Sequence, residues 1–337
     1  MTKQHIKVSV SAFKSALSLI PTPLVSQSGN IGCYRLLATD GNLTVMSYNL
    51  TASGSAYIPD VEGTDMDITI PASLVKILMF GSKDLHLEVV GNQLVNKNNK
   101  NKISLINTED WLDDIEVMGE SVFLGDLVSN LKSASLFACE DREILKRVKI
   151  SSSGLFATNG HIAYAAELGT GVDNDLFLPT SAIPYLTKQC DAVFGSDGNI
   201  KITTADSDVI VFGSNPGNYP PVEHLFPKSL KYQADINTEK ALAILALIKG
   251  VGANSAVDII NQDNRLHIAF SSDTVEILED VGVEDLTEWE TISFSSRYLG
   301  QVLAGSEIKT LRQNSPTTAA IFESEGIKAL LMPIMKR

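Results

Sequence analysis

The histidines and cysteines are the side chains of this 337-residue sequence that are best suited to nucleophilic, acid–base or metal chemistry. They are His5, His86, His161, His224 and His267, and Cys33, Cys139 and Cys190. The histidines are scattered, and none lies at metal-ligand spacing from a cysteine. The sequence also has no Gly-x-Ser-x-Gly, glycine-rich phosphate loop or His-Glu-x-x-His motif. We therefore expect a protein that is not an enzyme and that holds no metal and no other cofactor.

The cysteine count and the hydropathy pattern indicate the compartment. An odd number of cysteines without a Cys-x-x-Cys pair favours reduced thiols over a disulfide framework. The longest uninterrupted apolar run, residues 241–248, is far shorter than the ~20 residues that a membrane-spanning helix needs. Residues 1–10 lack the apolar segment of a signal peptide. These features predict a cytoplasmic protein without a membrane partner.

The charge balance is acidic, with 27 Lys and Arg against 40 Asp and Glu and a net charge of −13. Such a chain binds nucleic acid poorly unless its cations are segregated onto one surface. Acidic residues gather near Glu116 and across residues 276–290, and we interpret both runs as solvated faces. The position of the basic residues therefore matters more than their number.

An internal repeat supplies the elements that would position these side chains. Apolar residues at helical spacing predict three amphipathic helices, and their marker residues Phe13, Leu127 and Leu242 lie 114 and 115 residues apart. A second helix is expected in each repeat, and these helices open at Pro71-Ala-Ser, Pro179-Thr-Ser and Phe294-Ser-Ser. Strand-like runs surround the helices and turn at Asp40-Gly41, Asn159-Gly160 and Asn264.

The repeat predicts an α+β fold built from three helix–strands–helix–strands domains. Their boundaries are expected near Glu116 and Ser229, which gives domains 1–116, 117–229 and 230–337. An apolar content of 44% is sufficient for each domain to bury a core of its own.

Four stretches on this repeat resemble the bacterial sliding clamp family, the beta subunit of DNA polymerase III. They are Ala157-Thr-Asn-Gly-His161, Tyr219-Pro220 to Leu225-Phe-Pro-Lys228, Phe294-Ser-Ser-Arg-Tyr298, and the tail Leu330-Leu-Met-Pro-Ile-Met-Lys-Arg337. The resemblance runs the whole length and implies the DNA clamp fold, with two chains in a head-to-tail homodimeric ring of six domains. It further implies a noncatalytic protein that encircles double-stranded DNA irrespective of its sequence. Its partners would be an ATP-dependent clamp loader and the replicative DNA polymerase.

The resemblance also implies a partner-peptide cleft between the second and third domains, for a short peptide with a Gln and two or three large apolar residues. Its residues would be Leu145, Thr158, Gly160, His161, Ile162, Ala163, Pro220, His224, Leu225, Tyr298, Leu330, Leu331, Met332, Pro333, Ile334 and Met335. Flexible, polarizable methionines suit an acceptor of varied side chains. Ile162 and His224 replace arginines that are usual in the family, and Asn254 replaces a Phe. The peptide motif, and a host or phage origin of this divergent chain, stay open.

Basic residues recur at one position of the predicted second helices. At about 100° per residue, Lys76 and Lys188 lie about 200°, and Arg297 about 160°, from a buried leucine of the same helix. An ordinary solvated helix face would carry the same cations, so the pattern by itself leaves both interpretations open. With the resemblance, the predicted DNA-facing residues are Lys14, Lys76, Lys132, Lys188, Lys240 and Arg297.

Ring closure is predicted to use apolar positions of the first and third domains. Ile103 and Leu105 fall on a predicted edge strand, and Ile248 falls on a helix of the third domain. An exposed strand edge invites pairing with another chain, although an ordinary buried alternation explains the same pattern. The alternative function is a monomeric three-domain interaction scaffold that does not encircle DNA.

Overall fold

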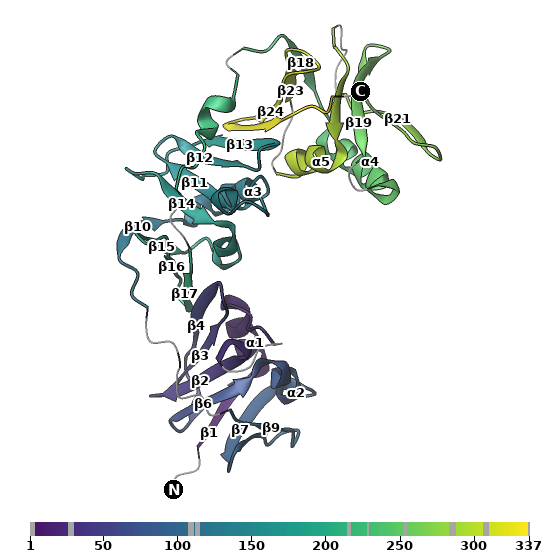
Figure 1. Ribbon diagram of the computed structural model, residues 1–337. Coiled ribbons are helices and arrows are strands. Elements are labelled where there is room, and N and C mark those ends of the chain that lie inside the picture. The colour runs from purple at the N-terminus through teal and green to yellow at the C-terminus, as the bar shows by residue number, and fades with distance from the viewer. Residues whose placement is uncertain are drawn as a thin grey trace. The chain divides into compact units, whose positions relative to one another are not determined.

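The computed structural model of the chain describes residues 4–25, 30–106, 111, 115–213, 217–227, 229–252, 255–282, 288–305 and 310–335. The chain divides into two compact units, Met1–Asp126 with Pro184–Asn215 and Leu127–Ile183 with Pro216–Arg337. Each unit consists of antiparallel sheets and short helices (Figure 1). The predicted α+β class is therefore confirmed. Among the described residues, no helix has the length and apolar character needed to span a membrane.

The first unit has two antiparallel sheets. Its strands are β1 (His5–Ser9), β2 (Cys33–Thr39), β3 (Asn42–Tyr48), β4 (Ala52–Ile58), β5 (Glu62–Gly63), β6 (Met66–Pro71), β7 (Asp84–Val90), β8 (Gln93–Asn96), β9 (Lys102–Ser104), β10 (Gly119–Phe123), β15 (Asp191–Gly195), β16 (Ile200–Thr203) and β17 (Ser207–Val211). The strand orders are β5-β1-β7-β8-β9 and β10-β15-β16-β17-β4-β3-β2-β6. The helical segments are α1 (Val10–Leu19), α2 (Val75–Met79), η1 (Asn30–Gly32) and η2 (Ala72–Leu74).

The second unit also has two antiparallel sheets. Its strands are β11 (Arg147–Ser151), β12 (Gly154–Thr158), β13 (Ile162–Glu167), β14 (Leu176–Pro179), β18 (Tyr232–Asp235), β19 (Ala256–Gln262), β20 (Arg265–Ser271), β21 (Glu276–Asp280), β22 (Ile292–Ser295), β23 (Thr310–Gln313), β24 (Ala320–Ser324) and β25 (Ile327–Leu331). The strand orders are β14-β11-β12-β13-β25-β24-β23-β18 and β21-β20-β19-β22. The helices are α3 (Val128–Ser135), α4 (Thr238–Val251) and α5 (Ser296–Ala304), with the 3-10 turns η4 (Glu143–Leu145) and η6 (Val222–Leu225).

The order of elements repeats three times along the chain. β1 precedes α1, β10 precedes η3 (Gly125–Leu127) and α3, and β18 precedes α4. Later in each repeat, β6 precedes η2 and α2, β14 precedes η5 (Thr180–Tyr185), and β22 precedes α5. The marker residues Phe13 and Leu127 are buried and Leu242 is half-buried, so the predicted apolar stripes face the core. The threefold repeat is confirmed.

The second repeat is shared between the two compact units. β17 pairs with β4 of the first repeat, and β13 pairs with β25 of the third. Backbone hydrogen bonds therefore join each half of the second repeat to a different neighbour. The two compact units therefore correspond to the shared sheets and not to single repeats. The domain boundaries near Glu116 and Ser229 stay predictions.

Tight turns connect the strands where the sequence predicted them. Asp40 and Gly41 have φ angles of 52° and 76° between β2 and β3, and Asp263 and Asn264 have 53° and 62° between β19 and β20. Both are two-residue hairpins with left-handed central residues, the geometry that matches the twist of paired strands. The expected turns at Asp40-Gly41 and Asn264 are confirmed.

The second helix of the second repeat differs from the prediction. The chain there forms only the 3-10 turn η5, which contains Pro184 and ends at Tyr185. Proline lacks a backbone N–H and clashes with the preceding turn, so an α-helix does not continue through this segment. Lys188 lies in a turn beyond η5, and the helical angle predicted for it has no structural basis.

Candidate functional site

The turn between β12 and β13 holds His161 in a defined position. Asn159 Oδ1 accepts hydrogen bonds from the backbone N–H groups of His161 (2.8 Å) and Ile162 (3.0 Å). Thr158 Oγ1 donates to the carbonyl of Ile162 at 2.7 Å, and Gly160 has a φ of 92° that favours glycine. An Asn side chain that accepts from its own turn in this way supplies hydrogen bonds that strand pairing does not provide there. His161 is therefore presented at the tip of an ordered hairpin.

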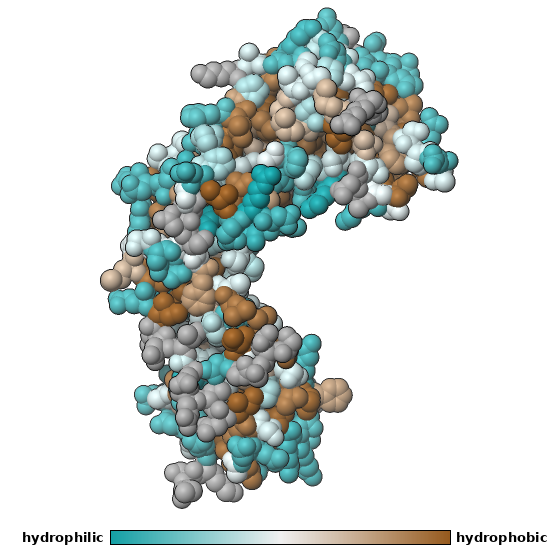
Figure 2. All heavy atoms as spheres, in the orientation of Figure 1, coloured by the Kyte–Doolittle hydropathy of each residue, from teal (hydrophilic) through white to brown (hydrophobic). Residues whose placement is uncertain are grey.

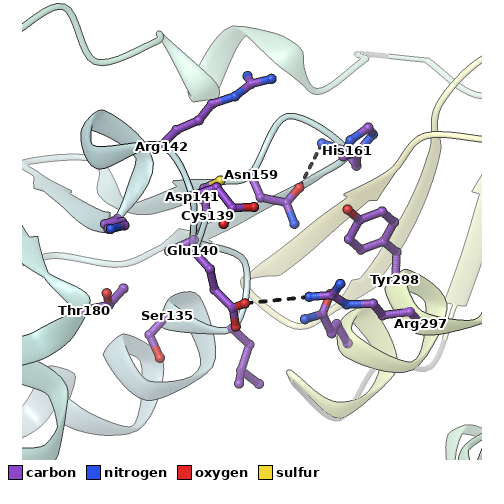
Figure 3. A pocket seen from close by; sticks show the side chains of 14 residues that line it. Ser135, Cys139, Glu140, Asp141, Arg142, Asn159, His161, Thr180, Arg297 and Tyr298 are labelled. Atoms are coloured by element: carbon purple, nitrogen blue, oxygen red, sulfur yellow. Dashed lines mark hydrogen bonds and ion pairs between the residues drawn. The ribbon is translucent and has the colours of Figure 1, made fainter. Parts of the chain in front are cut away.

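The structure brings His161 together with Tyr298, which α5 supplies from the third repeat. Their rings are stacked, with centroids 5.1 Å apart and planes at 21°. Figure 3 shows the two side chains converging from the β12–β13 hairpin and from α5. Two residues that the resemblance assigned to one cleft, 137 positions apart in the chain, are thus neighbours in space.

The C-terminal tail runs beside the same hairpin. β25 pairs with β13, and the N–H of Met332 then donates to the carbonyl of His161 at 3.0 Å. The N–H of Ile334 donates to the carbonyl of Ser293 at 2.7 Å. These bonds fix the tail backbone, while the side chains of Met332 (45% exposed) and Met335 (63% exposed) remain accessible. Their apolar surface is available to a partner.

The linker before the third repeat covers one face of the sheet that contains β12 and β13. Val222 in η6 is fully buried there, in a cluster with Phe156 and Ala163. The side chains of His224 and Leu225 in the same turn are exposed, and Leu225 is 50% exposed. The linker therefore buries one residue and presents two others to solvent.

The predicted cleft residues fall into two groups. Six have buried side chains, and they support the surface from below without offering area to a partner: Leu145, Thr158, Ile162, Ala163, Leu330 and Leu331. The exposed or half-buried ones are Gly160, His161, Pro220, His224, Leu225, Tyr298, Met332, Pro333, Ile334 and Met335. Asn254, Lys228 and the last two residues of the tail lie outside the described residues.

A cavity of about 550 Å³ lies beside the His161–Tyr298 stack (Figure 3). Its lining adds charged residues that sequence reasoning missed, among them Glu140, Asp141 and Arg142. The run of three charged residues directly before η4 was the available signal. The predicted linker and tail residues do not line this cavity.

Arg297 also lines this cavity. Its Nη2 lies 4.0 Å from Glu140 Oε2, and its guanidinium lies 5.8 Å from the centre of the Tyr298 ring. A carboxylate at this distance offsets part of the positive charge. Arg297, which is predicted to face DNA, thus lies beside Tyr298, which is predicted to belong to the peptide cleft.

The six basic residues predicted to face DNA are all exposed. Lys14, Lys76, Lys132, Lys240 and Arg297 lie on α1, α2, α3, α4 and α5 respectively, and Lys188 lies in the turn after η5. Helices therefore present five of the six cations.

The predicted interface residues are less accessible than the sequence suggested. Ile103 on β9 and Ile248 on α4 are buried in the cores of their own units, so their side chains cannot bury further area against a second chain. Leu105 is half-buried against the core of the first unit. The large apolar side chains that α4 does expose are Leu247, at 68%, and Val251, at 45%.

Burial shifts the pKa of a tyrosine in the sheet and of another in the linker. Burial raises the pKa of Tyr164, on β13, to about 12. Burial also raises the pKa of Tyr219, whose hydroxyl donates to the carbonyl of Arg147 at 3.3 Å. Both groups are neutral near pH 7.

Among the described residues, no group of three or more His, Cys, Asp and Glu side chains could hold a metal ion.

Comparison with known proteins places this architecture in a class. Solved structures match it over nearly the whole chain: a DNA polymerase sliding clamp from Bacillus subtilis (18% identity, TM-score 0.83, 100% of both chains) and DNA polymerase III, beta subunit from Thermotoga maritima (15%, 0.82, 99% of this chain and 100% of that one). A Helicobacter pylori beta clamp bound to a DNA ligase peptide also matches (15%, 0.82, 98% and 100%). No family model and no curated protein sequence matches the chain. The chain therefore has the DNA clamp fold, and the resemblance seen in the sequence is confirmed at the level of the fold.

Proposed function

We propose that this chain is a divergent bacterial-type DNA sliding clamp. Two copies form a closed ring around duplex DNA and act as a noncatalytic processivity factor in the cytoplasm. The ring tethers the replicative DNA polymerase and other partners through the surface formed by the His161 hairpin, the linker and the C-terminal tail. One observation carries this proposal: the order of the strands in the four sheets.

The two eight-stranded sheets are assembled by one rule. In one sheet, the strands of the second repeat end in β17, which pairs with β4 at the end of the strands of the first repeat. In the other sheet, the strands of the third repeat end in β25, which pairs with β13 at the end of the strands of the second repeat. The same rule applied to the two remaining sheets leaves β9 as the free end of one and β21 as the free end of the other. Pairing of β9 with β21 of a second copy, twice, would complete six equivalent domains with no such edge left open.

Charge supports this pairing. Lys100, before β9, and Lys102, on β9, are exposed, and so are Glu276 and Glu279 on β21. Opposite charges on facing edges favour association of the correct surfaces. Apolar area would come from Leu105 beside β9, which is half-buried, and from the exposed side chains of Leu278 on β21 and Leu247 on α4. Figure 2 shows apolar patches among the hydrophilic residues of one face of the molecule.

A ring explains how so acidic a chain could act on DNA. Encirclement holds the duplex by topology, whereas strong phosphate contacts would slow sliding and base contacts would impose sequence stops. The exposed helical cations need only favour the DNA weakly. A closed ring must also be opened to admit DNA, and we assign that step to an ATP-dependent clamp loader.

The solution mass and the retention on DNA test this proposal together. A ring should have about twice the 36.4 kDa of one chain, and after loading it should stay on circular duplex DNA but slide off after linearisation. A mass of one chain, with no topology-dependent retention, would favour the monomeric interaction scaffold instead.

A further inference from the structure

Lys149 is a buried cation in the middle of β11. All five residues of this strand are buried, and the Lys149 side chain is only 11% exposed. Removal of an ammonium group from water is costly unless opposite charges compensate it. A lysine at this position therefore needs specific partners.

Its partners come from two segments that are distant in sequence. Lys149 Nζ lies 2.9 Å from Asp175 Oδ2, in the loop before β14, and 3.1 Å from Glu223 Oε1, in η6 of the linker. Burial by itself would lower the pKa of Lys149, but the hydrogen bonds to both carboxylates outweigh burial, and the pKa is raised. The ammonium therefore stays charged and bridges the sheet to the linker.

The bridge lies on the face of the sheet that the linker covers. Lys149 is the cross-strand partner of Phe156 on β12 and of Phe177 on β14. Phe156 belongs to the apolar cluster that buries Val222, and the rings of Phe177 and Tyr219 lie 5.3 Å apart. The linker is thus packed on both sides of Lys149.

The backbone hydrogen bonds that Val222 and His224 donate are local and do not fasten η6 to the sheet. The N–H of Val222 donates to the carbonyl of Pro220, and the N–H of His224 donates to that of Pro221. The buried Val222 side chain and the Glu223–Lys149 ion pair are contacts that do reach the sheet. Apolar packing is non-directional, whereas the charged hydrogen bond sets one orientation of the turn.

We infer that Lys149 is a positioning residue for partner binding: through Glu223 it holds η6 so that His224 and Leu225 stand beside the partner-peptide surface. This inference rests on the proposed function. Because η6 is ordered before the partner binds, the free energy of binding does not include the entropic cost of ordering the linker. Lys149 acts through Leu225 and makes no contact with the partner itself.

A double-mutant cycle on the full chain tests this role. The probe is a synthetic peptide with one Gln and two large apolar residues, and the readout is its Kd. We expect Lys149→Met to weaken binding about tenfold and Lys149→Arg to restore it to within about twofold. In a Leu225→Ala background, Lys149→Met should have a much smaller effect, because the apolar side chain that it positions is gone. Equal effects in both backgrounds would overturn the inference.

Lys328→Met is the matched control. Lys328 is on β25 of the same sheet and pairs with Glu167 at 2.6 Å, but its side chain is 41% exposed, against 11% for Lys149. This variant should leave the Kd unchanged. An effect on the Kd as large as that of Lys149→Met would show that the loss of any lysine from this sheet weakens binding, and it would also overturn the inference.

Amide hydrogen exchange separates this inference from the proposed function. Lys149→Met should speed exchange in residues 222–225, and Lys328→Met should not. If the wild-type chain binds no such peptide, the proposed function fails, and the exchange rates still decide whether Lys149 holds the turn. Unchanged exchange in Lys149→Met would refute the positioning role.

Discussion

The two junctions between repeats, β13–β25 and β4–β17, have the same strand pairing but differ in their side chains. At β13–β25, one face carries Phe156, Ala163 and Leu330, and Val222 of the linker is buried against them. At β4–β17, the junction carries polar residues and a cavity of about 520 Å³. Its lining includes Ser53, Ser55, Tyr57, Lys201 and Asp208.

This difference is the reason that we place the proposed partner site at one junction. Strand pairing needs only backbone groups, so it is reproduced at each junction. An apolar acceptor needs particular side chains, and of the two junctions it is β13–β25 that combines a packed linker, the His161–Tyr298 stack and an accessible Met332. The four predictions that follow challenge this contrast.

Deletion of residues 332–337 should have the largest effect. Loss of Met332 and Met335 removes two apolar anchors worth about 1.5–3 kcal/mol each when buried. Peptide affinity should fall by two or more decades, since one decade is ~1.4 kcal/mol, while the dimer remains intact. Titration with the peptide and measurement of the solution mass check this result together.

Two variants control the deletion. Met332→Ala should give a smaller loss of peptide affinity with an intact ring. Tyr57→Ala, at the polar β4–β17 junction, should change neither quantity. If Tyr57→Ala weakened the peptide as much as the deletion did, the contrast between the junctions would be wrong.

Leu105→Asp probes the third junction, which we place between two copies. A charge beside β9 would be desolvated on pairing, at a cost of several kcal/mol if it stays unpaired. We expect the dimer to dissociate at concentrations where the wild type sediments as a dimer. Val90→Asp, at the exposed end of β7 in the same sheet, is the control and should sediment like the wild type. A dimeric Leu105→Asp chain would contradict the assignment of this interface.

Replacement of Lys76, Lys188 and Arg297 by Glu should weaken loading and flatten the salt dependence of DNA association. Removal of one phosphate contact changes the slope of log K against log salt by about 0.9, and two copies double the number of sites. The same exchange at Lys97, Lys201 and Lys328, which lie on or directly beside strands, should leave the slope almost unchanged. Arg297→Glu by itself should have the smallest share, because Glu140 already lies beside it.

Glu223→Gln should give the smallest effect, one that depends on pH. Burial would raise the pKa of Glu223, but hydrogen bonds from its own backbone N–H and from Lys149 outweigh burial and lower the pKa below its usual value. The carboxylate therefore stabilises the folded state above its unfolded pKa, and that contribution is lost as pH falls through the folded value. The Tm difference between wild type and Glu223→Gln should shrink as pH is lowered from about 7 toward 4. A Tm difference that does not change with pH would show that the ion pair between Lys149 and Glu223 does not anchor the linker.

Much of the fold could be predicted because its signals are local. The hairpins at Asp40-Gly41 and Asn264 follow from residues that tolerate left-handed backbone, and the helices follow from apolar spacing. The second helix of the middle repeat was mispredicted because Pro184 permits only a 3-10 turn. The cavity beside Tyr298 was missed because the charged residues Glu140, Asp141 and Arg142 do not by themselves show which distant residues they meet.

The sequence by itself determined the threefold repeat and the α+β class, and the resemblance predicted that His161, Tyr298 and the tail lie together. Periodicity and turn chemistry act over a few residues, and the resemblance supplied the remaining assignments. Only the tertiary structure decided that Ile103 and Ile248 are buried in their own cores, that β9 and β21 each lie at the end of a sheet, and that Lys149 meets Glu223 of the linker. Burial, edge pairing and ion pairs depend on which distant segments meet, and no local pattern in the chain encodes that.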